Sequence, residues 1–95
     1  MGALLIVQAA VSDRARYREY QDAVRPFIEA CGGRLRATGK DLEVLEGAHD
    51  GRRLVVFEFP SMHALHAFWR SPEYARIRTL RDGAASAEVW AIPFT

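Results

Sequence analysis

The sequence has little of what several classes of protein require. It contains a single cysteine, Cys31, which excludes an internal disulfide and a metal site built from cysteines alone. Its 13 basic and 12 acidic residues leave a net charge of +1, so the charge balance gives no reason to expect nucleic acid or an anionic membrane as a partner. The apolar run near the N-terminus lacks the preceding basic residues of a signal peptide and is too short to span a bilayer. We therefore expect a cytoplasmic protein.

Motifs that bind cofactors or mark common catalytic machinery are also missing. There is no glycine-rich nucleotide loop, no serine–histidine–aspartate order and no pair of cysteines. His63 and His66 stand three residues apart on a predicted helix, but no third ligand follows at the usual spacing. Twelve of the 13 basic residues are arginine, a bias to which we attach no functional weight. We expect no tightly bound cofactor and no metal.

What the sequence does contain predicts one domain spanning residues 1–95. Its 49% hydrophobic and 26% charged residues are typical of a globular chain. An apolar stripe from Tyr17 onward, repeating every three or four residues, predicts a helix from the Ser12–Asp13 cap to Cys31. Pro26 should kink this helix or divide it in two. Shorter helices are predicted at 62–70 and from Pro72 onward, and strands are predicted at 3–11, 34–38, 53–59 and 87–94.

This order of elements, βαββαβ, predicts an α+β protein with the ferredoxin-like fold, in which an antiparallel sheet carries its helices on one face. In the third strand Val55, Phe57 and Phe59 would lie under the helices. Leu54 and Val56 would face the other way, on a sheet surface that no helix covers. An exposed apolar face of this size is unusual on a monomer. We therefore expect a homodimer, a dimeric α/β barrel in which two sheets close against each other.

Glu58 is the best candidate for a catalytic acid or base. An ionised carboxylate is costly to bury without a partner, so Glu58 among the apolar residues of the third strand either faces a polar cavity or is paired. In a closed, poorly hydrated barrel such a carboxyl group is suited to proton transfer near neutral pH. The alternative is a structural role, either in an ion pair with Arg36 or Arg53 or in a hydrogen bond to Gln8.

Four further residues complete the predicted site. His49 lies in a loop at one end of the sheet, beside Asp50, which would orient its ring for acid–base chemistry. Gln8 and Arg36 would share the uncovered face with the carboxylate and bind substrate. Trp90 lies on the same face, where it would either form the wall of a ligand site or anchor the dimer.

Four segments, taken in order, resemble a known family. They are GGRL at 32–35, EVLEG at 43–47, RLVVFEFPS at 53–61 and FWRSPEY at 68–74. Together with the pair Tyr17 and Tyr20 and with Leu80-Arg81, they are similar to the domain-of-unknown-function family thirteen-thirty, which belongs to the dimeric α/β-barrel superfamily. The resemblance implies a ferredoxin-like fold and a sheet-to-sheet dimer. It implies little about chemistry, because relatives in the superfamily include cofactor-free monooxygenases, isomerases, dehydratases and haem-degrading enzymes.

The chain departs from that family in one place. The family often has an arginine where this chain has Thr38, just before Gly39. If that arginine binds an anionic ligand in relatives, the contact is lost here or is taken over by Arg36.

Two classes of function remain open. The first is an enzyme without a tightly bound cofactor, which uses Glu58, with His49 or Arg36, on a small substrate that carries a carbonyl or a phenol. The second is a ligand-binding or structural dimer without turnover. RNA binding, which other domains of this topology perform, is disfavoured because the first strand has no aromatic residue on which a base could stack. A cavity of roughly 300 Å³ or more with Glu58 facing it would favour the enzyme.

Overall fold

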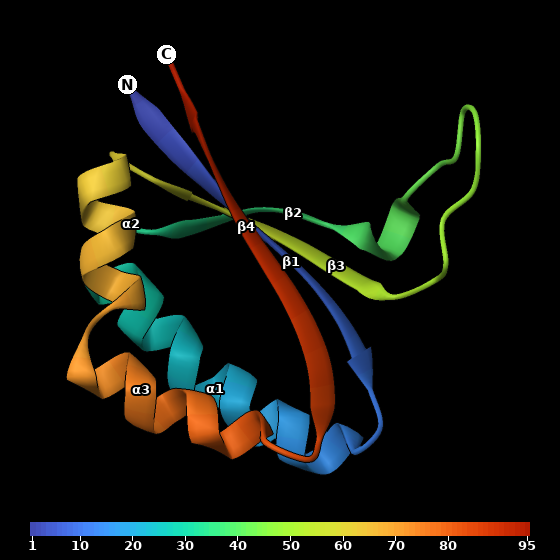
Figure 1. Cartoon of the computed structure of the whole chain (residues 1–95), viewed down its shortest axis with the longest axis horizontal. Helices are drawn as coiled ribbons and strands as arrows, with labels where there is room; N and C mark the ends of the chain where they lie inside the picture. The colour runs from blue at the N-terminus through green and yellow to red at the C-terminus, as the bar shows by residue number, and fades with distance from the viewer.

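A computed structural model describes all 95 residues and contains a four-stranded antiparallel sheet with its helices on one side (Figure 1). The main elements are β1 (Gly2–Val11), α1 (Arg14–Ala30), β2 (Arg34–Thr38), β3 (Arg53–Phe59), α2 (Met62–Trp69), α3 (Pro72–Arg78) and β4 (Ala85–Phe94). Short 3₁₀ helices follow β2 and α3, at Gly39–Asp41 and Thr79–Arg81. The strand order β2-β3-β1-β4 is that of the ferredoxin-like fold, so the predicted α+β architecture is confirmed. No helix is both long enough and apolar enough to cross a membrane.

The limits of α1 follow directly from its sequence. The side chain of Asp13 accepts a hydrogen bond from the Arg16 N–H at 3.1 Å, which satisfies one of the free amides at the start of the helix. At the other end Gly32 has a φ of 90°, the left-handed conformation that terminates helices and that glycine adopts without steric cost. Pro26 lies inside the helix, yet α1 remains one continuous element. The predicted division into two helices therefore does not occur.

Two serines cap the N-termini of α2 and α3. The hydroxyl of Ser61 accepts a hydrogen bond from the Ala64 N–H at 3.1 Å, and that of Ser71 accepts one from the Tyr74 N–H at 3.0 Å. Pro72 occupies the first turn of α3, where its missing N–H has no intrahelical partner to lose. The second cap turns the chain so that Tyr74 is buried in the core.

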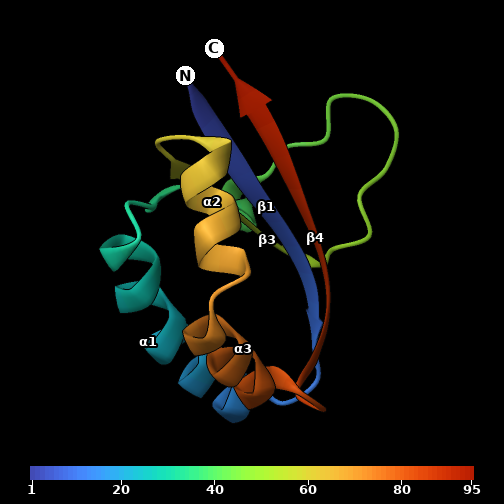
Figure 2. The ribbon, with the colours of Figure 1, turned by 60° about the vertical axis from the view of Figure 1, so that its left-hand side comes forward.

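Pairing between the strands divides the sheet residues between two faces. Leu5 lies opposite Phe57 and Ala3 lies opposite Phe59, and all four are buried under the helices. Figure 2 shows α1 and α2 together on this side. The face without helices, which we call the open face, consists of Leu4, Ile6, Gln8, Leu54, Val56, Glu58, Glu88, Trp90, Ile92 and Phe94. The predicted assignment of the residues of β1, β3 and β4 to the two faces is therefore correct.

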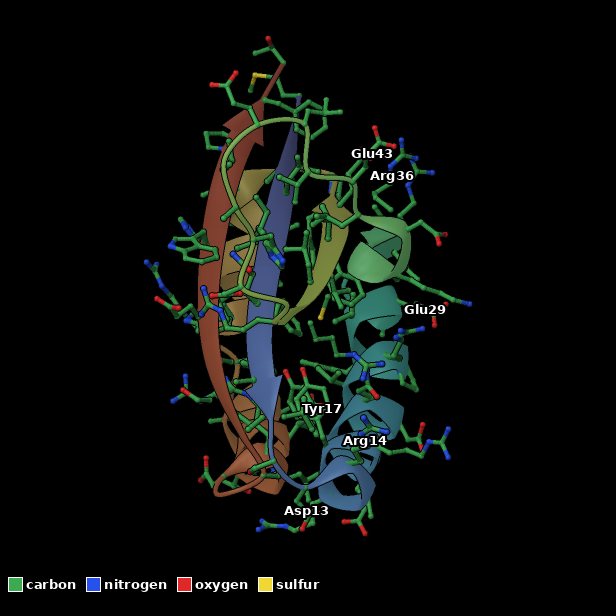
Figure 3. All side chains as sticks on the ribbon, turned by 90° about the vertical axis from the view of Figure 1, so that its right-hand side faces the viewer. Asp13, Arg14, Tyr17, Glu29, Arg36 and Glu43 are labelled. Atoms are coloured by element: carbon green, nitrogen blue, oxygen red, sulfur yellow. The ribbon has the colours of Figure 1, made fainter.

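The structure differs from the sequence prediction in β2 and in the segment after it. Regular alternation predicts Leu35 and Ala37 on the same face, but a register shift between them places Ala37 opposite Val56, on the open face. Arg36 is the extra residue of this irregularity. The pattern also predicts an extended segment at 42–46, but no strand forms there because no other strand lies beside it. Figure 3 shows this segment in the loop between β2 and β3, which passes in front of the open face.

Candidate functional site

Glu58 lies on the open face and forms ion pairs with two arginines of β2. Its Oε1 is 3.1 Å from Nε of Arg36 and 3.6 Å from Nη2 of Arg34. The Glu58 side chain is only 22% exposed, whereas Arg36 and Arg34 are 53% and 67% exposed. Arg36 is thus one of the partners that the sequence suggested. Arg34 was not anticipated, and Arg53 and Gln8 make their contacts elsewhere. Two guanidinium groups around one carboxylate leave one positive charge in excess.

His49 and Gln8 form a second polar pair. His49 Nε2 lies 3.0 Å from Oε1 of Gln8, and the Gly51 N–H donates to His49 Nδ1 at 3.1 Å. Because Nδ1 accepts, the ring proton resides on Nε2 and is donated to Gln8. The prediction that Asp50 orients the ring is wrong, because the Asp50 carboxylate instead accepts from Arg52, through the backbone N–H at 3.1 Å and through Nε at 2.8 Å.

The predicted site residues form two contacts rather than one cluster. Glu58 pairs across the sheet with Leu4, whereas Gln8 pairs with Leu54. The two contacts are therefore four residues apart along β1, roughly 13 Å. Trp90, which lies opposite Ile6, stands between them on β4 and is 44% exposed. Glu58 does not line any of the three main clefts of the chain.

Metal-ligating side chains do not gather in this chain. His63 is exposed on α2, and His66 on the same helix is half-buried. No group of three or more His, Cys, Asp or Glu side chains is placed to hold a metal ion.

The helix side of the sheet contains a small cavity, which we call the inner cavity. Its volume is about 40 Å³, enough for ordered water but far below the 300 Å³ or more of a typical ligand site. Tyr20 and Tyr74 line it with their hydroxyl oxygens 2.9 Å apart, and the Arg81 guanidinium lies 5.5 Å from the centre of the Tyr20 ring. Its other walls are mostly apolar, formed by Leu5, Val7, Tyr17, Gln21, Val24, Arg25, Ile28, Val55, Phe57, Phe68, Trp69 and Val89.

Hydrogen-bond donors are in excess in the inner cavity. In the pair of Tyr20 and Tyr74 one hydroxyl donates to the other, so the accepting hydroxyl keeps a proton that needs another acceptor. Arg81 cannot supply one, because a guanidinium only donates. Burial, and then the nearby Tyr74, raises the pKa of Tyr20, so its phenol stays protonated at neutral pH. Burial also raises the pKa of Tyr17, although Arg53 and Arg81 oppose the shift. The cavity can therefore bind an acceptor such as the oxygen of a ligand.

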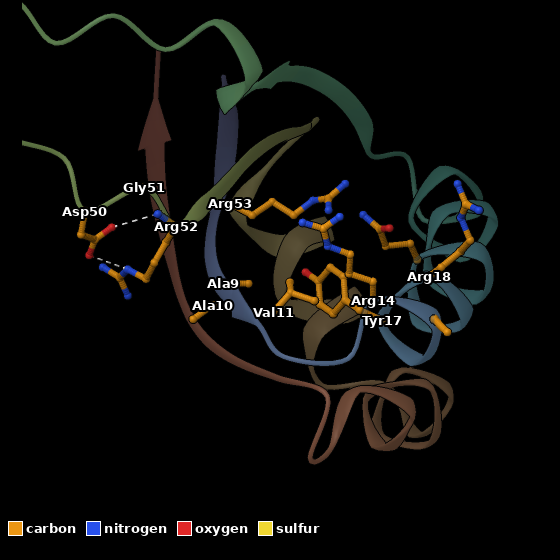
Figure 4. A pocket seen from close by; sticks show the side chains of 12 residues that line it. Ala9, Ala10, Val11, Arg14, Tyr17, Arg18, Asp50, Gly51, Arg52 and Arg53 are labelled. Atoms are coloured by element: carbon orange, nitrogen blue, oxygen red, sulfur yellow. Dashed lines mark hydrogen bonds and ion pairs between the residues drawn. The ribbon is translucent and has the colours of Figure 1, made fainter.

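A larger cleft opens where β1 ends and β3 begins (Figure 4). Its volume of about 690 Å³ lies within the range of small-molecule sites. Tyr17 and Gln21 line both this cleft and the inner cavity, so the two adjoin. A neighbouring hollow of about 440 Å³ shares Gln21 and residues 51–53 with it. We call the cleft and the hollow together the end cleft. It is lined by Ala9, Ala10, Val11, Arg14, Ala15, Tyr17, Arg18, Gln21, Arg25, Thr38, Gly39, Lys40, Asp50, Gly51, Arg52, Arg53, Leu54 and Val55.

The end cleft is strongly basic. Six of the 13 basic residues of the chain line it, against one of the 12 acidic residues, Asp50. Arg52 is paired with Asp50 and with Glu88. The other five have no carboxylate within ion-pair distance: Arg14, Arg18, Arg25, Lys40 and Arg53.

Sequence reasoning missed this cleft, although α1 carries a signal for it. Arg14, Arg18, Gln21 and Arg25 recur at intervals of four, three and four residues, so they share one face of the helix. That face lies beside the apolar stripe that begins at Tyr17. The number of arginines alone indicates only a bias in composition, whereas their positions along the helix indicate a basic face.

Comparison with solved structures finds the same fold in proteins of low sequence identity. A protein of unknown function from Rhodopseudomonas palustris, RPA0582, has a TM-score of 0.78 and 18% identity over 99% of this chain and 82% of its own. SnoaB, a cofactor-independent oxygenase from Streptomyces nogalater, has a TM-score of 0.71 and 10% identity over 99% and 93%. A dimeric protein of unknown function and ferredoxin-like fold from Bacteroides fragilis has a TM-score of 0.63 and 13% identity over 98% and 96%. At these identities the likeness shows the fold alone.

Comparison of sequences gives a family. The model described as "Domain of unknown function (DUF1330)" matches residues 2–94. No curated protein matches the chain in sequence.

Proposed function

The chain belongs to the DUF1330 family, and we propose that it forms a homodimeric α/β barrel that binds and transforms a small organic molecule without a tightly bound cofactor. The family description gives no activity, so the proposal rests on the site. SnoaB, which has the same fold, is a cofactor-independent oxygenase. That likeness is an analogy of fold, which supports the class of chemistry and does not identify a substrate.

The open face supports the homodimer. Trp90, Ile92 and Phe94 are 44%, 48% and 39% exposed in the single chain, and leaving such a surface in water is unfavourable. The Bacteroides fragilis protein of the same fold is described as dimeric. Packing the open face of one copy on that of another would bury these side chains and would also cover Glu58.

The excess of donors in the inner cavity carries the proposal for the ligand. A protonated tyrosine hydroxyl and the Arg81 guanidinium face a small apolar space with room for an oxygen atom and little more. A ligand would therefore occupy the end cleft and reach the inner cavity with one carbonyl or phenolic oxygen. Donors at that place stabilise negative charge on the oxygen, as an enolate or phenolate requires.

The open face holds a second candidate site. Glu58 is half-buried between two arginines, and a sheet-to-sheet dimer would enclose it further. In this alternative Glu58 and His49 are the acid–base pair, and Gln8, Arg36 and Trp90 contact the substrate. We propose that the protein is cytoplasmic, whichever of the two sites binds the ligand, as the sequence predicts.

The test compares the two sites with one probe. Binding of 1-naphthol to the full-length protein is titrated against naphthalene, which has the same rings without the oxygen. We expect Tyr20→Phe and Tyr74→Phe each to weaken 1-naphthol binding about tenfold, because a buried hydrogen bond to the oxygen is lost. Glu58→Gln and His49→Gln are the matched variants of the open face and should leave this binding within about twofold.

The outcomes separate the alternatives. Loss of binding in Glu58→Gln, with no change in the tyrosine variants, would place the site on the open face. Oxygen uptake and mass spectrometry of the products then measure turnover. Binding of 1-naphthol and of any molecule that co-purifies in native mass spectrometry, without a product, would indicate the non-catalytic ligand-binding dimer instead.

A further inference from the structure

The charge of the end cleft is not explained by a neutral substrate. Five basic side chains without a carboxylate partner line a hollow of a chain whose net charge is only +1. All five are exposed residues, so water screens part of their mutual repulsion, but gathering like charges on one hollow still costs energy at low ionic strength. An anion bound in the cleft would offset that cost, and the field of the cleft would also concentrate anions at its mouth.

We infer that the ligand is a small organic acid, whose anionic group is held in the end cleft by Arg14 and Arg53 while its carbonyl or phenolic end points to the inner cavity. This inference rests on the proposed function, since it uses the same cavity for the uncharged end. It adds the class of ligand, a carboxylate or a phosphate monoester that also carries an apolar ring or chain.

Arg14 and Arg53 are the residues best placed to hold the anion. They come from different elements, the first turn of α1 and the first residue of β3, yet their side chains extend into the same space above the Tyr17 ring (Figure 4). The Arg53 guanidinium lies 5.9 Å from the centre of that ring. Stacking on Tyr17 fixes the guanidinium without using its N–H groups, which remain free to bind both oxygens of a carboxylate.

Tyr17 marks the boundary between the charged and apolar parts of the site. It is buried and lines both the end cleft and the inner cavity. An acid group on its outer side and an oxygen acceptor on its inner side would belong to one ligand that passes along the ring. The remaining cations, Arg18, Arg25 and Lys40, surround this path and strengthen the field without defining a geometry.

The experiment compares charged and neutral probes of one shape. Benzoate, phenyl phosphate and neutral benzamide are titrated calorimetrically into the full-length protein at low ionic strength, and inorganic phosphate serves as the anion without a ring. We expect at least one of benzoate and phenyl phosphate to bind about tenfold or more tightly than benzamide, and the tighter of the two identifies the anionic group. Affinity for that probe should fall with added salt, whereas affinity for benzamide should not.

Two variants locate the anion. Arg14→Gln with Arg53→Gln should reduce the affinity for the anionic probe to that for benzamide, whereas Arg76→Gln, which removes an exposed arginine of α3, should change it less than twofold. Circular dichroism establishes that the double variant is folded. If it is not, the single variants and the salt dependence of the wild-type protein decide the question.

Failure of this inference differs from failure of the proposed function. Equal binding of benzoate, phenyl phosphate and benzamide, together with 1-naphthol binding that Tyr20→Phe weakens, would overturn the acid and leave the cavity as the site. Anion binding that depends on the arginines, together with 1-naphthol binding that does not depend on Tyr20, would support the acid and overturn the inner cavity. Inorganic phosphate binding as tightly as phenyl phosphate would show an adventitious ion only, and no binding of either anionic probe would overturn the inference.

Discussion

The same strands supply both faces of the sheet, but the side chains of one face are buried and those of the other are not. Along β3, Val55 and Phe57 are buried under the helices, whereas their neighbours Val56 and Glu58 remain half-buried on the open face. The helices of the same chain cover the helix face. The open face has comparably apolar residues but no helix over them, and only the loop between β2 and β3 passes in front of it (Figure 3). One strand of seven residues thus supplies part of a covered core and part of an apolar surface for which we propose a second molecule as the cover.

The polar groups of the two faces differ in the same way. Under the helices, Tyr20 and Tyr74 are hydrogen-bonded to each other around a small cavity. On the open face, Glu58 meets arginines that are more than half exposed. The bond between Tyr20 and Tyr74 is thus made within one chain and leaves one hydroxyl proton for a ligand, whereas the energetic value of the ion pairs depends on how much water a second copy would remove.

The largest expected effect comes from placing the same charge on each face in turn. Val55→Asp puts a carboxylate in the core and should unfold the chain, at a cost above about 4 kcal/mol. Val56→Asp, one residue later, should leave the fold intact and weaken the dimer by about 2–4 kcal/mol. Circular dichroism measures the first change and sedimentation measures the second.

Ala67→Asp serves as the control for both variants, because Ala67 is exposed on α2 and belongs to neither face. It should leave the fold and the dimer unchanged. A wild-type chain that sediments as a monomer at micromolar concentration, or a Val56→Asp variant that dimerises normally, would contradict the proposed use of the open face.

Alkaline pH should destabilise the helix face specifically. Burial raises the pKa of Tyr17 and Tyr20 above the value of 10.0 found for a free tyrosine. Above pH 10 the unfolded chain therefore loses protons that the folded chain keeps, so the free energy of unfolding falls as pH rises, by at most about 1.4 kcal/mol per pH unit for each group. Below about pH 9 these two groups should contribute no pH dependence.

Urea denaturation at pH 9 to 11 tests this expectation. The variant Tyr17→Phe with Tyr20→Phe should lose less stability over that range than the wild-type chain. Phe27→Leu, which changes packing without removing a titrating group, should parallel the wild type. Identical slopes in all three chains would mean that the tyrosines keep their usual pKa in the folded state.

Glu58→Gln should have the smallest effect and should depend on the dimer. In the single chain the two arginines are mostly solvated, so losing the charge should cost about 0–1 kcal/mol of unfolding free energy. In the dimer the cost should be larger, because the partner removes water from the pairs. Denaturation of Glu58→Gln in the wild-type and Val56→Asp backgrounds measures both values, and equal values would mean that the partner does not cover Glu58.

The sequence predicted those features that depend on short-range patterns. The bounds of β2 and β3 and the direction of Glu58 followed from strict alternation, which a half-buried sheet requires. The irregularity at Arg36 could not be predicted, because five residues fit a regular and an irregular strand equally well. The partner of Asp50 was also missed, since the choice between His49 and Arg52 depends on how the loop folds back on itself.

The site was less predictable than the fold because it joins distant segments. The end cleft combines the first turns of α1 with residues 50–53, and only the strand pairing brings them together. The arginine stripe on α1 was visible in the sequence, but nothing local indicated that it faces a hollow rather than solvent. Burial of Tyr17 beside the stripe is the feature that distinguishes the two cases.

The strand order has a consequence for symmetry. In a two-fold dimer every charge of the interface is duplicated, and charges on the axis meet their own copies. The surplus positive charge of Arg34 and Arg36 around Glu58 would then be a self-repelling contact if β2, the strand that carries the arginines, lay at the centre of the sheet. Because β2 is an edge strand, Arg34 and Arg36 lie at the margin of the open face, where the axis of a centred dimer does not pass. The order β2-β3-β1-β4 thereby leaves the centre of the face to the apolar residues Ile6 and Val56, which can be apposed to themselves without electrostatic cost.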